Sequence, residues 1–124
     1  MIHLDTSALI ASLTGPRSHA AILRRLVSDG ERLGVSALVL YEWRRGPRTQ
    51  HELRDQEALV PGAGAIAFGS TEAALAADLY RRLRRPRQQE IDIAIAACAI
   101  AWNAAFWTLN PQDFTDIPGL ELAG

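Results

Sequence analysis

Short strand-like runs alternate along this chain with longer segments that have the hydrophobic spacing of helices. Four of these runs, residues 2–4, 32–36, 65–68 and 106–109, are too short to be independent helices. Strands that alternate with helices are typical of an α/β fold with a mainly parallel sheet. We therefore predict a central sheet of four to five short strands flanked by helices, with residues 120–122 as the final edge strand.

The predicted helices are delimited by caps and by Gly-Pro or Asn-Pro pairs. Ser18 and Ser36 are suited to cap the second and third helices, because a serine hydroxyl can accept from a free backbone N–H. The helical segments predicted in this way are residues 7–13, 19–30, 37–43, 51–59, 70–83 and 90–104.

The length and composition indicate one globular domain over residues 1–124. At 124 residues, with 48% hydrophobic residues, the chain can build a substantial core. The longest apolar run, residues 93–102, is about half of the ~20 residues that a membrane span needs, so we expect no membrane segment. The start lacks the pattern of a secretory signal, and the single cysteine, Cys98, lies in that apolar run. These features favour a reducing, cytoplasmic compartment and a buried, inert thiol.

The positive charge of the chain is carried entirely by arginine. All 13 cationic residues are Arg, and five lie close together at positions 81, 82, 84, 85 and 87. Arg binds phosphate in a bidentate manner, so this cluster is a candidate RNA-binding segment. The alternative, a solvated helix end in an arginine-rich chain, stays open, because the formal net charge is only −1.

Two acidic residues follow predicted strands. Asp5 comes directly after residues 2–4, and Asp113 follows residues 106–109. Ligand sites of open parallel sheets lie beyond the carboxyl ends of the strands, which favours a functional role for both. A helix cap for Asp5 and a turn or cap for Asp113 are the structural alternatives.

Two further acidic residues lie on predicted helices. Glu42 occurs in the apolar segment SALVLYEW, where a carboxylate is costly unless it is paired or bound to a metal. An ion pair with Arg44 or Arg45 is its structural alternative. Asp92 begins the apolar segment 93–102, and favourable interaction with the helix dipole is the alternative there. Glu90 and Asp116 are further candidate acids near Asp92 and Asp113.

Together these carboxylates favour a divalent cation. Clustered carboxylates repel one another, and Mg²⁺, which takes oxygen ligands, removes that repulsion. The spacing of His and Cys residues does not match a zinc site.

The four acidic motifs resemble those of PIN-domain ribonucleases, and among them the VapC toxins of toxin–antitoxin pairs. IHLDTSALI at 2–10, VLYEW at 39–43, DIAIAACA at 92–99 and WTLNPQDF at 107–114 are similar to the family motifs in the same order. Leu109 departs from them, because many relatives have a basic residue there.

The resemblance implies a three-layer α/β/α PIN domain that cleaves RNA with Mg²⁺ or Mn²⁺. The implied acidic site is Asp5, Glu42, Asp92 and Asp113, with Asp5, Asp92 and Asp113 as metal ligands. Thr6, Ser7, Thr108 and Asn110 are the implied supporting polar residues. It also implies a VapB-like antitoxin as partner and a homodimer.

Three other functions are compatible with the same residues, and one of them is an interaction protein with a capped α/β fold and scattered acids. The chain could be a non-catalytic PIN-like module that binds RNA or a protein partner. Asp5-Thr6 also resembles the phospho-acceptor of an aspartyl-phosphate enzyme, but that chemistry normally uses a Lys, and this chain has none.

Overall fold

The strands form a parallel sheet with the first strand at its centre. The computed structural model describes residues 1–15, 19–84 and 86–123, without the side chains of residues 86 and 87. In it β1 (Ile2–Leu4) lies between β2 (Leu33–Gly34) and β3 (Ala105–Trp107). Ile2 pairs with Leu33 on one side and with Ala105 on the other. Because these strands run in the same direction, the residues that follow β1 and β3 meet at one edge of the sheet.

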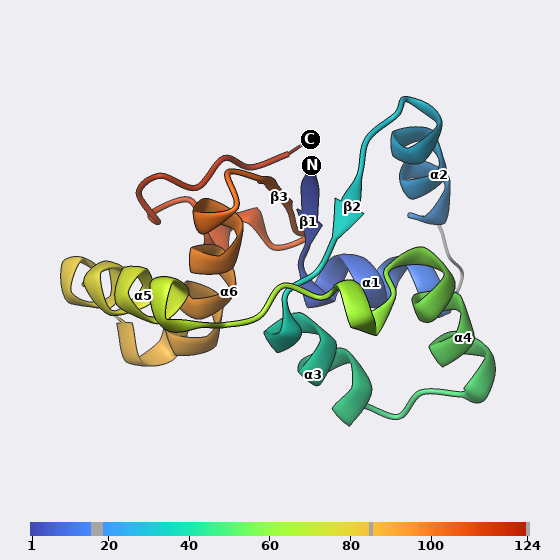
Figure 1. Cartoon of the computed structure of the whole chain (residues 1–124), viewed down its shortest axis with the longest axis horizontal. Helices are drawn as coiled ribbons and strands as arrows, with labels where there is room; N and C mark the ends of the chain where they lie inside the picture. The colour runs from blue at the N-terminus through green and yellow to red at the C-terminus, as the bar shows by residue number, and fades with distance from the viewer. Residues whose placement is uncertain (16–18, 85, 124) are drawn as a thin grey trace.

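Helices lie on both sides of this sheet, as Figure 1 shows. On one side α5 (Ser70–Arg82) packs against α6 (Glu90–Ala101). On the other side α1 contacts three helices in turn. These four helices are α1 (Thr6–Leu13), α2 (Ala20–Ser28), α3 (Ala37–Arg45) and α4 (Gln50–Leu59). The arrangement confirms the predicted α/β/α fold.

The sheet is smaller than the sequence predicted. The predicted strands 65–68 and 120–122 are reduced to single parallel bridges, Ser36 to Ile66 and Phe106 to Leu122. The first cannot extend because Ser36 already begins α3, and a short 3₁₀ turn, η1 (Gly62–Gly64), comes just before Ile66. The second follows Gly119, whose φ of +86° turns the chain. The sheet therefore has three strands instead of the four to five that were predicted.

The end of the last helix also differs from the prediction. The last helix ends at Ala101 rather than residue 104, because Asn103 has a φ of 55° and stops the helix in the left-handed region. α3 begins at the predicted cap, where Ser36 Oγ accepts from the backbone N of Val39 at 3.2 Å. The predicted cap of α2, Ser18, lies outside the described residues.

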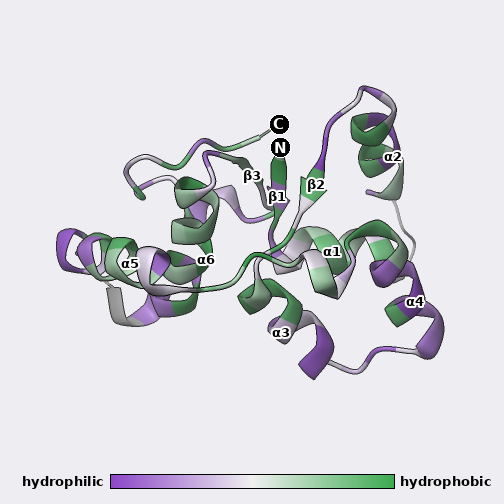
Figure 2. Ribbon diagram, in the orientation of Figure 1, coloured by the Kyte–Doolittle hydropathy of each residue, from purple (hydrophilic) through white to green (hydrophobic). Residues whose placement is uncertain are grey.

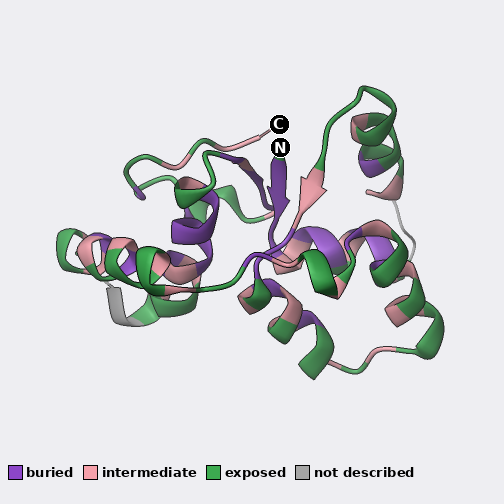
Figure 3. Cartoon of the chain, viewed as in Figure 1, coloured by how far each residue is buried: buried purple, intermediate pink, exposed green. Residues whose placement is uncertain are grey.

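The core lies between β1 and the helices on its two faces. Figure 3 shows β1 as a buried strand, whereas α2 and α4 are largely exposed. Leu4 of β1, Leu9 of α1 and Ile93 of α6 are among its buried side chains. In Figure 2 the hydrophobic segments gather around the sheet, and the far ends of α3 and α4 are hydrophilic. Cys98 is buried as predicted, and burial raises the pKa of its thiol to about 11.

No helix in the described ranges is both long enough and apolar enough to cross a membrane.

Candidate active site

Asp5 lies where β1 passes into α1, and hydroxyl groups hold its side chain. Its backbone occupies the cap position of α1, but its carboxylate makes no capping hydrogen bond. Instead Oδ2 accepts from Thr108 Oγ1 at 2.7 Å and from Ser7 Oγ at 3.1 Å. The side chain therefore points to the end of β3, and a simple helix cap does not describe its role.

The polar residues after β1 and β3 form one hydrogen-bonded network. Ser7 Oγ accepts from the backbone N of Leu109 at 3.1 Å and lies 3.3 Å from Thr108 Oγ1. Thr108 Oγ1 accepts from the backbone N of Asn110 at 3.0 Å. Ser7 and Thr108 thus fix the orientation of the Asp5 carboxylate. Asn110 joins this network through its backbone N–H and is itself exposed.

The environment of Asp5 disfavours its ionised form. Asp5 is 6% exposed, and burial is the main reason why its pKa is raised above the ordinary value of 3.8. Hydrogen bonds from the Thr108 hydroxyl, the backbone N–H of Thr6 and the Ser7 hydroxyl lower the pKa, whereas the charge of Glu42 raises it. The hydroxyl groups offset part of the cost of burying this carboxylate.

Glu42 reaches the same region from α3. Thr6 Oγ1 donates to Glu42 Oε1 at 2.6 Å, which connects α3 to the residue after Asp5. Arg45 lies 3.7 Å from Glu42 Oε2, so the ion pair considered from the sequence is also present. α3 is less buried than its apolar sequence indicated, because only Val39 and Trp43 are fully enclosed. The Glu42 side chain is 21% exposed and so remains accessible from the site.

Asp92 carries the clearest sign that the four acidic residues converge. Its pKa is raised from 3.8 to about 6, first by burial and then by the charges of Asp5, Asp113 and Glu42. These three acids come from the end of β1, from η3 (Pro111–Asp113) and from α3. All three are among the charges that raise the pKa of Asp92 at the start of α6.

A polar cavity of about 300 Å³ adjoins Asp92. Its lining residues are Gln88, Gln89, Asp92 and Asp113. Gln89 Nε2 donates to the backbone O of Asp113 at 3.3 Å and so joins η2 (Pro86–Gln89) to η3. Gln88 and Gln89 were not among the residues predicted from the sequence. The sequence feature that could have indicated them is a pair of uncharged amide side chains directly before the first acidic residues of α6.

The two additional candidate acids lie elsewhere. Glu90 lines a separate groove of about 380 Å³ between α5 and α6, together with Ile93 and Ala94. This agrees with the rule that helical residues two apart face different ways. Asp116 is exposed, and it is not among the charges that raise the pKa of Asp92.

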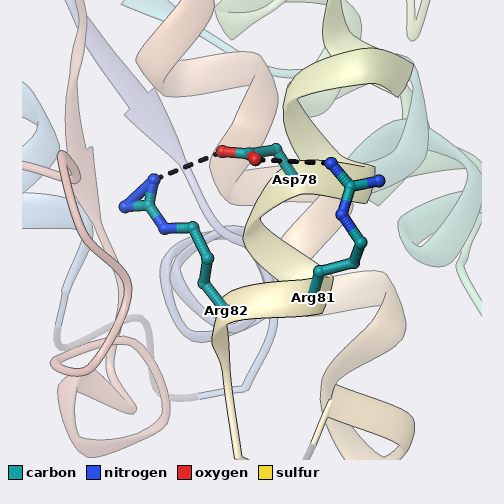
Figure 4. Close-up of polar contacts among 3 residues, drawn as sticks. All are labelled: Asp78, Arg81 and Arg82. Carbon is teal, nitrogen blue, oxygen red and sulfur yellow. Dashed lines mark hydrogen bonds and ion pairs between the residues drawn. The ribbon is translucent and has the colours of Figure 1, made fainter.

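Part of the arginine cluster is held by an acidic residue of its own helix. Asp78 lies 3.5 Å from Arg81 and 3.2 Å from Arg82, and Figure 4 shows it between the two side chains. Both arginine side chains are more than half exposed, which leaves each able to contact a phosphate. Arg84 is exposed as well, while the side chains of Arg85 and Arg87 lie outside the described residues.

The donor set fits a hard divalent cation. The groups that converge are carboxylates with nearby hydroxyls, which suits Mg²⁺ or Mn²⁺. Among the described residues, no three Asp, Glu, His or Cys side chains already stand close enough to hold a metal ion. Repulsion between bare carboxylates opposes such close approach, and the raised pKa of Asp92 reflects it. A cation would therefore have to draw these side chains together.

Comparisons with known proteins place the chain in a family. Residues 2–120 match the family model of the PIN domain. The chain is also 30% identical over 120 residues to Ribonuclease VapC19 of Mycobacterium tuberculosis (strain ATCC 25618 / H37Rv), with 95% of each chain covered. This chain belongs to the PIN-domain family. Within that family it groups with the VapC proteins, as its four acidic motifs indicated.

Solved structures of other proteins share the fold of this chain. VapBC2 from Rickettsia felis, bound to a DNA fragment from its promoter, matches with a TM-score of 0.77 and 25% identity. That match covers 99% of this chain and 98% of the other. FitAcB from Neisseria gonorrhoeae matches with a TM-score of 0.75 and 19% identity, over 99% and 97% of the two chains. The second likeness, at its lower identity, supports the fold alone.

Proposed function

We propose that this PIN-domain protein is a divalent-cation-dependent endoribonuclease and the toxin of a toxin–antitoxin pair. The observation that carries the proposal is that Asp92 and Asp113 line one polar cavity, while Asp5 is hydrogen-bonded to Thr108 and Glu42 to Thr6. A curated relative named as a ribonuclease and a VapBC complex among the related structures support the same function. Residues 1–124 would act as a single catalytic domain.

Asp5, Asp92 and Asp113 would hold Mg²⁺ or Mn²⁺. When bound, the cation would supply a Lewis acid that stabilises charge on the scissile phosphate and activates water. Ser7 and Thr108 orient the Asp5 carboxylate through the hydrogen bonds described above. Glu42, which accepts a hydrogen bond from Thr6 Oγ1, would position the attacking water. Hydrolysis then breaks one phosphodiester bond of the RNA.

Arginine side chains would bind the RNA backbone. Arg81, Arg82 and Arg84 are exposed near the end of α5, which the chain connects to the site through η2. Each phosphate contact releases counterions, so the affinity for RNA should fall steeply as salt is added. Arg85 and Arg87, which lie outside the described side chains, belong to the same proposed segment.

The proposed role as a toxin also implies partner proteins. We expect a VapB-like antitoxin that blocks the acidic site, a homodimeric toxin, and action on RNA in the cytoplasm. Co-expression with the product of an adjacent small reading frame should relieve growth inhibition by this chain. Size-exclusion chromatography with light scattering measures the oligomeric state directly.

Cleavage of RNA by the purified chain tests the proposal. We expect discrete, Mg²⁺-dependent cuts, mapped as new 5′ ends, that are lost in Asp5→Asn. Asp29→Asn, which changes an exposed acid at the end of α2, is the matched control and should cleave normally. Wild-type rates in Asp5→Asn would refute the site. Tight RNA binding with no cleavage in Mn²⁺ would instead indicate a non-catalytic module.

A further inference from the structure

Gln89 connects the two segments that carry Asp92 and Asp113. It is the last residue of η2 and precedes α6, so it lies three positions before Asp92. Its side chain makes no capping hydrogen bond to α6, although it occupies the cap position. Its Nε2 instead donates to the backbone O of Asp113, 24 residues farther along the chain.

This contact lies beside the proposed metal ligands. The cavity of about 300 Å³ is lined by both glutamines of the segment and by Asp92 and Asp113. Asp92 and Asp113 both line this cavity, and two carboxylates that share a cavity repel each other without a cation. A hydrogen bond to the backbone of Asp113 resists the separation of these two segments.

The chemical nature of the side chain suits this role. An amide donates a hydrogen bond but carries no charge, so it holds Asp113 without neutralising either acid. A Lys or Arg at position 89 would add a positive charge, which would compete with the cation for the carboxylates. Gln89 thus restricts the geometry of the site while preserving its negative potential.

We propose that Gln89 is a positioning residue that holds Asp113 near Asp92 and so prepares the pocket for a divalent cation. This inference rests on the proposed metal-dependent function, and it assigns Gln89 no contact with the reacting atoms. Losing one hydrogen bond that pre-organises the ligands should weaken cation binding by about three- to tenfold.

Two variants and one control test the proposal on the full chain. Gln89→Leu and Gln89→Met remove the donor and keep a side chain of similar length. Gln112→Leu is the matched control, because it removes an exposed amide from η3 outside the cavity lining. Mn²⁺ binding by each protein alone is measured by isothermal titration calorimetry. We expect a three- to tenfold higher Kd for Mn²⁺ in both Gln89 variants and an unchanged Kd in the control.

Cleavage as a function of Mg²⁺ separates positioning from folding. In the Gln89 variants the Mg²⁺ concentration for half-maximal rate should rise, while the rate at saturating Mg²⁺ stays near wild type. A lower saturated rate with an unchanged midpoint would assign Gln89 a merely structural role and overturn the proposal. An unchanged Mn²⁺ Kd in both variants would also overturn it.

The two readouts also separate this inference from the proposed function. A Gln89-dependent Mn²⁺ Kd in a protein that cleaves no RNA would support the positioning role and refute the nuclease. Normal cleavage with no Gln89 effect on Mn²⁺ or Mg²⁺ would refute the positioning role alone. A wild-type chain that binds no Mn²⁺ would overturn both.

Discussion

Asp92→Asn should make the metal-free protein more stable while removing a proposed metal ligand. The pKa of Asp92 is raised from 3.8 to about 6, by burial first and then by Asp5, Asp113 and Glu42. Such a shift corresponds to about 3 kcal/mol of cost in the ionised state, at about 1.4 kcal/mol per pH unit. Asp92 is partly exposed, and solvent screening reduces this cost to about 1–2 kcal/mol. Asparagine has nearly the same shape and avoids the cost.

The pH dependence of this gain has a definite sign. Above about pH 6 Asp92 is ionised in the folded and unfolded states, and the full cost is present. Below its unfolded pKa of 3.8 it is protonated in both, and the cost disappears. The free energy of unfolding of Asp92→Asn should therefore exceed that of wild type at pH 8, and the difference should shrink as the pH falls toward 4.

Urea denaturation in EDTA at several pH values measures this difference. Asp116→Asn is the matched control, because Asp116 is exposed and does not contribute to the raised pKa of Asp92. Adding Mg²⁺ should stabilise the wild type through linkage and stabilise Asp92→Asn much less. A difference that is absent at pH 8, or one that is constant from pH 4 to pH 8, would refute the electrostatic argument.

Three further predictions concern the residues around the site and the sheet. Thr108→Val removes the donor to Asp5 and should lower the free energy of unfolding by about 1–2 kcal/mol in urea. The acid limb of the pH–rate profile for cleavage should also move to higher pH in this variant. Ser36→Ala removes the cap that accepts from Val39 and should cost about 1 kcal/mol in thermal melts, with an unchanged cleavage rate. His3 is 2% exposed, and burial lowers its pKa from 6.5 to about 4. Between pH 6.5 and pH 4 His3 takes up a proton only in the unfolded state, so the wild type should lose about 3 kcal/mol of its free energy of unfolding over this range. His3→Phe has no such group, and urea denaturation at several pH values should show that this loss is absent from the variant.

Local signals in the sequence were sufficient for most of the fold. The runs at 2–4 and 106–109, with helices between them, predicted the strands that bring Asp5 and Thr108 together. The edge strands were overpredicted because pairing depends on a neighbour. The segment around Ile66 has the composition of a strand. Ile66 pairs only with Ser36, because α3 begins directly after Ser36 and leaves no further extended residues for pairing.

The candidate site was predictable by residue type and less so by geometry. The motifs identified the four acids, and the structure gives the electrostatic coupling among them. Glu90 and Asp92 line different cavities, because residues two positions apart on a helix face different ways. Gln89 could not be found in this way, because its role depends on Asp113, a residue 24 positions away.

The hydrogen-bond partners of the acidic residues orient them without neutralising their negative charge. Asp5 is held by two hydroxyl groups, and the backbone of Asp113 is held by an amide. Neutral donors orient a carboxylate but leave its charge available to a cation, whereas an ion pair would neutralise it. Glu42 is the exception, since Arg45 contacts it, but that arginine is 59% exposed and can move away. The cost of this arrangement appears as the raised pKa of Asp92, and binding a cation would recover it. The stability of this chain should therefore depend on divalent cations for the same reason that its activity would.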